Sequence, residues 1–282
     1  MTKIKEAMMR AVFALLASVS ALCVVLICVF LFANGIPAMT KIGVPDFLLG
    51  TTWRPGNDIY GIFPMILASI YVSAGAMIIG VPLGILCAVY LAYFCPKKVY
   101  RVLKPMTELL SGVPSIVYGF FALVVLVPAM RVLFGAGKSL LTACILLGIM
   151  ILPTIISVTE SALLAAPKTY YEGALALGAS HEQSVFRAVL PAAKSGISAA
   201  IMLGIGRAIG ETTAVAMVVG NQPVVPGSLL QGARTLTTNI VLEMGYAAGL
   251  HREALIATAV VLFVLVLLIN LSFSLFKRRD QA

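Results

Sequence analysis

Six stretches of this chain are apolar for about as long as a helix needs to cross a lipid bilayer. Crossing the roughly 30 Å hydrocarbon core takes about 20 mainly apolar residues in helical form. The six predicted spanning helices cover residues 11–33, 66–94, 106–130, 140–165, 194–220 and 254–276. The sequence therefore predicts an all-α, polytopic, multi-pass membrane protein, organised as a single transmembrane domain over residues 1–282.

The composition excludes a water-soluble globule. Hydrophobic residues make up 61% of the chain and charged residues 11%, whereas soluble domains average about 45–50% and about 25%. The five cysteines are odd in number and have no spacing typical of a disulfide framework or a metal site. We therefore interpret them as small buried hydrophobic side chains.

The distribution of lysine and arginine predicts the orientation. The first apolar run spans residues 11–33, longer than the 7–15 residues of a signal-peptide core, so it is expected to remain as a spanning helix. With the N-terminus in the cytoplasm, 13 of the 20 Lys and Arg residues fall inside and six outside, and Arg207 is left within a span. The positive-inside rule thus places both termini in the cytoplasm. It also explains the net charge of +9 without a nucleic-acid partner.

The predicted cytoplasmic loop 166–193 is too polar to span the membrane, yet it carries helix signals. Thr169 with Glu172, and Ser180 with Gln183, have the spacing of capping boxes. Gly178 suits a left-handed helix end, and Pro191 is expected to end the second helix. The loop is therefore predicted to form two short helices joined at a glycine.

This loop resembles the inner-face motif of ABC importer permeases, written Glu-Ala-Ala, three residues, Gly, nine residues, Ile, one residue, Leu-Pro. The residues at the motif positions are Glu172, Gly173, Ala174, Gly178, Ala188, Leu190 and Pro191. Gly173 and Ala188 depart from the motif, and Phe186 and Val189 are expected to supply apolar contact instead. The resemblance implies that the loop docks onto a separate ATPase subunit; the alternative is an ordinary capped helical loop.

No motif predicts an enzyme. Gly137-Lys138-Ser139 lacks the earlier glycine of a P-loop, because position 132 is Val. His181-Glu182 lacks the second histidine of a zinc protease, because position 185 is Val. We therefore expect no catalytic site and no cofactor in this chain. The resemblance places ATP and Mg on the ATPase partner.

Residues 204–215, GIGRAIGETTAV, place Arg207 and Glu211 inside an apolar segment. A charge at mid-membrane costs roughly 2.5–3.5 kcal/mol on insertion scales. On one helix, a four-residue spacing puts the two side chains on one face, among Gly204, Gly206 and Gly210. One interpretation is a buried pair that fixes helix register. The other is a translocation path in which Arg207 binds an oxyanion and Glu211 orients it.

Two further glutamates fall within predicted spans. Glu108 lies near the inner end of its span, where it is expected to reach Lys104 or lipid headgroups. Glu160 lies within about two helical turns of the inner face. A structural partner and a role in transport are equally compatible with that position.

The longest resemblance is to the permeases of phosphate ABC importers, and to PstC-type subunits more than PstA-type ones. The matching stretches are residues 51–66, 111–128, 151–163, 170–180, 189–197 and 204–221. The most specific is the Gly-Arg-Ala-Ile-Gly-Glu-Thr signature, which holds Gly206, Arg207, Gly210, Glu211 and Thr212. These five residues are the predicted substrate pathway.

This resemblance implies type I ABC importer permease architecture and transport of inorganic phosphate across the bacterial cytoplasmic (inner) membrane. The implied partners are a second, PstA-type permease, two ATPase subunits and a periplasmic or extracellular phosphate-binding protein, with membrane lipid around them. Two alternatives stay open: an importer of another oxyanion such as sulfate or molybdate, and a channel or signalling component of the membrane.

Overall fold

The computed structural model describes the backbone of residues 2–279 and most of their side chains, but not those at 2–4, 274 and 276–279. Four of the 13 Lys and Arg residues that the prediction places inside thus lie outside the described side chains: Lys3, Lys277, Arg278 and Arg279. The helices are α1 (Thr2–Ile42), α2 (Val44–Leu49), α3 (Phe63–Val89), α4 (Lys97–Gly112), α5 (Ser115–Phe121), α6 (Val127–Phe134), α7 (Leu140–Ala165), α8 (Lys168–Ala176), α9 (His181–Ser184), α10 (Leu190–Ala192), α11 (Lys194–Gly210), α12 (Thr213–Val218), α13 (Leu236–Glu243) and α14 (Gly249–Arg279).

Shorter elements complete the fold. Strands β1 (Trp53–Arg54) and β2 (Ile59–Tyr60) pair antiparallel around a 3-10 turn at Pro55–Asn57. π-helical segments at Tyr90–Phe94, Ala122–Leu126 and Val185–Val189 extend or join neighbouring helices. The protein is therefore mainly helical, as the sequence predicts.

Five described helical segments are long and apolar enough to cross a membrane. They are Lys5–Ile42, Phe63–Phe94, Ser115–Phe134, Leu140–Ala165 and Gly249–Phe273. A sixth span is present if His181–Ala192 and Lys194–Gly210, which meet at 70°, count as one. The fourth predicted span, 140–165, coincides with α7.

The third and fifth predicted spans are wrong at one end. The third does not begin at 106, because α4 ends at Gly112 and Val113 is extended (φ −68°, ψ 126°). Val113 precedes Pro114, whose ring disfavours the helical conformation of the residue before it. The fifth does not continue to 220 as one helix, because α11 ends at Gly210 and α12 starts at Thr213.

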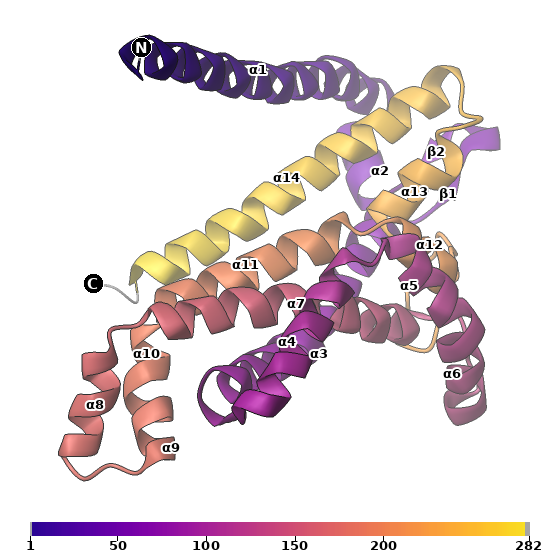
Figure 1. Cartoon of the computed structure of the whole chain (residues 1–282). Coiled ribbons are helices and arrows are strands. Elements are labelled where there is room, and N and C mark those ends of the chain that lie inside the picture. The colour runs from indigo at the N-terminus through magenta and orange to yellow at the C-terminus, as the bar shows by residue number, and fades with distance from the viewer. Residues whose placement is uncertain (1, 280–282) are drawn as a thin grey trace.

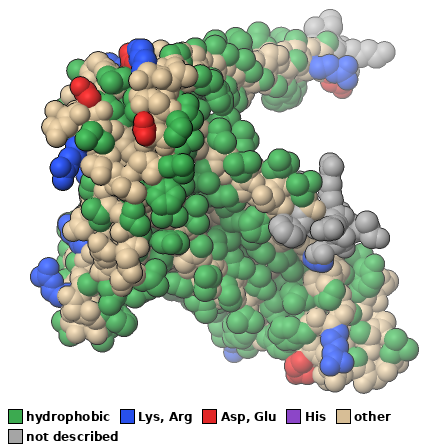
Figure 2. Space-filling model, turned by 180° about the vertical axis from the view of Figure 1, so that it is seen from behind, with side chains coloured by type: hydrophobic (Ala, Val, Ile, Leu, Met, Phe, Trp, Pro, Cys, Tyr) green, Lys and Arg blue, Asp and Glu red, His purple; other side chains and the backbone are tan. Residues whose placement is uncertain are grey.

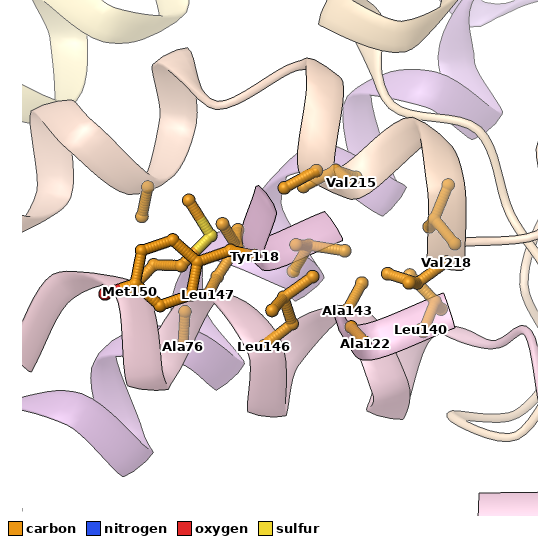
Figure 3. Close-up of a cluster of buried hydrophobic side chains, with 14 of the residues drawn as sticks. Ala76, Tyr118, Ala122, Leu140, Ala143, Leu146, Leu147, Met150, Val215 and Val218 are labelled. Atoms are coloured by element: carbon orange, nitrogen blue, oxygen red, sulfur yellow. The ribbon is translucent and has the colours of Figure 1, made fainter. Parts of the chain in front are cut away.

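The pair α3 and α7 forms the most extensive helix contact in the described chain. Glycines allow this closeness: a side chain at Gly80 would lie 2.6 Å from Ile151, and one at Gly148 would lie 3.0 Å from Ile79. Small residues of this kind permit membrane helices to approach each other. Side chains from α5 and α12, including Tyr118, Val215 and Val218, complete a buried apolar cluster against this pair (Figure 3).

The two ends of the molecule are built from different elements. The hairpin of α8 to α10 lies toward the same side as the start of α1 and the end of α14, whereas α2, the β-ribbon and α13 lie toward the opposite side (Figure 1). Hydrophobic side chains dominate the surface between the ends, and the charged ones gather near them (Figure 2). This arrangement suits a chain that is surrounded by lipid along its middle.

The helix α1 contacts the rest of the protein near its C-terminal end. Residues 5–27 are exposed throughout. Contact with α14 begins further along, where Phe32 packs edge-on against Phe263 with ring centroids 5.8 Å apart. A side chain at Gly35 would lie 2.6 Å from Val260. The helix thus forms an apolar arm (Figure 2).

Candidate functional site

Arg207 lies on α11, between the buried core and an open face of the protein. Its guanidinium Nη1 donates a 3.1 Å hydrogen bond to Oγ1 of Thr154 on α7. Gly206 and Gly210 are exposed, and a side chain at either position would meet no other atom within 4 Å. Gly204, by contrast, packs against Ile155. The sequence did not single out Thr154, which lies in one of the stretches that match phosphate permeases.

Glu211 does not share a helical face with Arg207, so that part of the sequence-based interpretation is wrong. Its backbone is extended (φ −71°, ψ 125°) and ends α11. Its carboxylate Oε1 accepts a 3.0 Å hydrogen bond from the backbone N–H of Ala214, and no ion pair joins these two described side chains. Side-chain hydrogen bonds of this kind compete with helix continuation.

The break after Gly210 is tied to the neighbouring segment. The half-buried Thr212 donates from Oγ1 to the carbonyl of Gly210, and Thr237 donates to the carbonyl of Glu211 at 3.3 Å. Gly206, Arg207, Gly210, Glu211 and Thr212 therefore lie close together, but around a bend instead of along one helix.

The predicted two-helix hairpin is present at the end of the protein opposite the β-ribbon (Figure 1). Ser180 Oγ accepts from Gln183 N at 3.3 Å, and Gln183 Oε1 accepts from Ser180 N at 3.1 Å, which confirms the second capping box. Gly178 has φ +86°, as the left-handed turn requires. The first capping box is wrong: α8 begins after Pro167, without a cap from Thr169.

Most motif residues of the hairpin reach its surface. Glu172, Gly173, Gly178 and Pro191 are exposed, whereas Ala174, Ala188 and Leu190 are half-buried. Pro191 does not end the helix, which continues to Ala192 before the 70° bend into α11.

Apolar side chains beside the motif divide into two groups. Leu177 is 91% exposed and Phe186 45% exposed, so both are available to a partner. Val189 is 1% exposed and packs inside the protein, so our expectation that it contacts a partner is wrong. Near the turn of the hairpin, His181 pairs with the Tyr171 hydroxyl at 2.8 Å and lies against Phe94.

Glu160 of α7 and Glu108 of α4 both lie near Lys104 on α4. The buried Glu160 accepts hydrogen bonds of 2.8 Å from the Tyr100 hydroxyl and from Lys104. Glu108 lies 3.7 Å from Lys104. These contacts give Glu160 the role of a structural partner that fastens α4 to α7.

A buried polar cluster at the β-ribbon end escaped the sequence analysis. The carboxylate of Glu243 accepts hydrogen bonds from Trp53 Nε1 at 2.9 Å, from Arg234, and pairs with His251 at 2.8 Å. Burial alone would raise the pKa of Glu243, but these three partners hold it below its ordinary value. Trp53 and Glu243 are 190 residues apart, so no local pattern marks the cluster.

Comparison with known proteins shows which family this chain belongs to. Residues 80–279 match the family described as binding-protein-dependent transport system inner membrane components. The chain belongs to this family. The family's members are membrane components of transport systems, which agrees with the spanning helices and the open face of α11.

Individual relatives and solved structures agree with the family. The chain is similar to the probable ABC transporter permease protein YqgH of Bacillus subtilis, with 42% identity over 79% of this chain and 74% of that protein. It is also similar to the phosphate transport system permease protein PstC of Mesorhizobium japonicum, with 34% identity over 86% of this chain and 81% of that protein.

The fold is that of an ABC transporter permease of type I. An inward-facing structure of the methionine ABC transporter MetNI aligns with TM-score 0.58 and 25% identity, over 78% of this chain and 94% of that one. A second inward-facing MetNI structure aligns with TM-score 0.64, over 81% of this chain and 99% of that one.

Proposed function

We propose that this chain is a membrane-spanning subunit of an ATP-driven importer that moves inorganic phosphate across the bacterial cytoplasmic membrane, with both termini inside. The observation that carries the proposal is the position of Arg207, a cation half-buried in an apolar helix beside the open face left by Gly206 and Gly210. PstC relatives, whose names specify phosphate transport, support the choice of cargo.

Arginine suits phosphate because its planar guanidinium donates two parallel hydrogen bonds to one oxyanion and stays charged. Thr154 on α7 accepts a hydrogen bond from one guanidinium nitrogen of Arg207. This bond limits rotation of the guanidinium. Gly206 and Gly210 leave room for the anion at the backbone, and Thr212 lies at the same bend. Glu211 directs its carboxylate to the backbone of Ala214, which draws its negative charge away from the path.

The importer requires partners. A second, PstA-type permease would face this chain, and an arginine from each would balance a doubly charged phosphate. A phosphate-binding protein would deliver the cargo from outside. Two ATPase subunits, which bind ATP and Mg, would dock on the hairpin through Glu172, Gly178 and the exposed Leu177 and Phe186. This chain itself would hold no cofactor and catalyse no reaction.

Uptake of labelled phosphate tests the cargo. Arg207→Gln is expected to insert and assemble but to reduce uptake at least about tenfold, the loss of a charge-assisted hydrogen bond worth roughly 1.5–3 kcal/mol. Excess sulfate or molybdate should leave the wild-type rate unchanged. Strong competition by either anion would point to another oxyanion, and normal uptake by Arg207→Gln would make the arginine structural.

Coupling to ATP is tested separately at the hairpin. Gly178→Val places a branched side chain at φ +86°, which costs roughly 1–2 kcal/mol, and Glu172→Lys reverses an exposed charge. Both variants should insert normally and lose ATP-driven uptake. Uptake that persists in both would favour a channel over an ATP-driven importer.

A further inference from the structure

A cavity of about 660 Å³ lies at the hairpin end of the protein. It is bordered by α4, by the end of α7 and by the π-helical segment Tyr90–Phe94 that follows α3. Its polar lining comes from Lys97, Tyr100, Arg101 and Lys104 of α4. Its apolar lining includes Leu91 and Leu164 from the neighbouring helices. None of these residues belongs to the proposed phosphate path.

The positive charge of this cavity is only partly balanced. Lys97, Arg101 and Lys104 are spaced four and three residues apart, so they share one face of α4. Lys104 is neutralised by Glu160 at 2.8 Å. Lys97 and Arg101 are exposed and form no ion pair with any described residue. The cavity therefore presents two exposed cations that are available to pair with an anion.

The remaining surface of α4 indicates what kind of anion this is. Val102 is 60% exposed, Met106 53% and Leu109 73%, and their spacing of four and three residues makes them an apolar stripe along the helix. A helix with a basic face and an exposed apolar face is typical of the membrane interface. At that depth, basic pockets between helices bind anionic lipid headgroups.

We propose that this cavity binds the phosphodiester headgroup of an anionic membrane lipid such as phosphatidylglycerol. Lys97 and Arg101 contact the phosphate, and the first methylenes of the acyl chains lie against Leu91 and Leu164. Free inorganic phosphate shares the anionic group but has nothing to place on the apolar lining. The inference does not depend on which cargo the protein transports.

Native mass spectrometry of the complete detergent-purified importer tests the site. We expect phosphatidylglycerol to remain bound while phosphatidylcholine does not, and millimolar inorganic phosphate to leave the bound lipid in place. The double variant Lys97→Gln, Arg101→Gln should weaken phosphatidylglycerol binding by roughly tenfold to thirtyfold, because each basic residue near an anionic surface contributes about fivefold to the affinity.

The matched control is Lys98→Gln, which removes an exposed cation of the same helix that does not line the cavity. It should retain the lipid. The proposal is overturned if both lipids bind equally, if inorganic phosphate displaces the lipid, or if the double variant and the control behave alike. Because all three residues are exposed, normal assembly of each variant is expected and is checked by the subunit composition of the same spectra.

Discussion

The guanidinium of Arg207 on α11 is held by the hydroxyl of Thr154 on α7 through a hydrogen bond of 3.1 Å. The cation of one helix is thus oriented by its neighbour, and not by the glutamate four residues away. This relationship separates the roles of two side chains that the sequence places together, and it leads to the first two predictions.

Thr154→Val removes the hydroxyl that holds Arg207 and keeps the shape of the side chain. We expect normal insertion and a fall in phosphate uptake of about threefold to tenfold, because one hydrogen bond of roughly 0.5–1.5 kcal/mol is lost. Thr154→Ser keeps the hydroxyl and should transport normally. The two variants are compared by initial uptake rates; equal rates would show that the hydrogen bond has no part in transport.

Glu211 caps α12 by accepting from Ala214 N, so an uncharged acceptor should serve nearly as well. Glu211→Gln is expected to keep wild-type thermal stability in detergent. Glu211→Ala should lose about 1 kcal/mol, typical of a lost helix cap. If Gln destabilises the protein as much as Ala does, then the charge of Glu211, and not its hydrogen bond, is what the fold needs.

The Glu243 cluster makes stability depend on pH. Because its partners hold the pKa of Glu243 below the ordinary 4.5, the ionised carboxylate stabilises the folded state above pH 4.5. That contribution is lost as the pH falls through the lower folded-state pKa. Above pH 4.5, Glu243→Gln should cost about 3–5 kcal/mol, the penalty for breaking a buried ion pair.

Thermal unfolding of wild type and Glu243→Gln from pH 7 to pH 3 checks this prediction. The difference between them should shrink as the pH falls below 4.5, where the Glu243 carboxylate of the wild type becomes protonated. Glu253, which pairs with Lys41 at 2.7 Å with both side chains exposed, provides the control, and Glu253→Gln should change stability by less than about 1 kcal/mol. A gap between wild type and Glu243→Gln that persists at pH 3 would contradict the argument.

Leucine at three glycines, one of them a control, should separate folding from transport. Gly80→Leu would force α3 away from Ile151 and the Gly148 carbonyl, 2.6 and 2.9 Å from the new side chain, so we expect poor assembly. Gly206→Leu enters open space and should assemble normally but lower uptake at least tenfold. Gly112→Leu, also in open space, should do neither. Normal uptake by Gly206→Leu would remove Gly206 from the path.

The approximate positions of five spanning helices could be predicted because hydrophobic length is a local property. The boundaries of α7 and the Ser180 capping box depend on neighbouring residues alone, and both are as predicted. The break after Gly210 is different. An apolar window does not distinguish a continuous helix from two pieces when one side chain, Glu211, can cap the second piece.

The polar contacts between distant segments could not be predicted. Trp53 and Glu243 meet only through the packing of the β-ribbon against α13, and Thr154 meets Arg207 only because α7 packs against α11. Val189 was misassigned for a related reason: a helical loop has an inner face, and the sequence motif does not say which apolar residue turns inward.

The contact between α1 and α14 has a consequence for how the chain is made. These helices pair through Gly35 and Val260, yet roughly 200 residues separate the end of α1 from the start of α14. During synthesis, α1 therefore enters the bilayer long before α14 has been made, and lipid acyl chains surround it until then. A chain whose synthesis stops before α14 would keep α1 in the membrane without its partner helix. Quality-control proteases could use this unpaired helix to distinguish unfinished chains from complete ones.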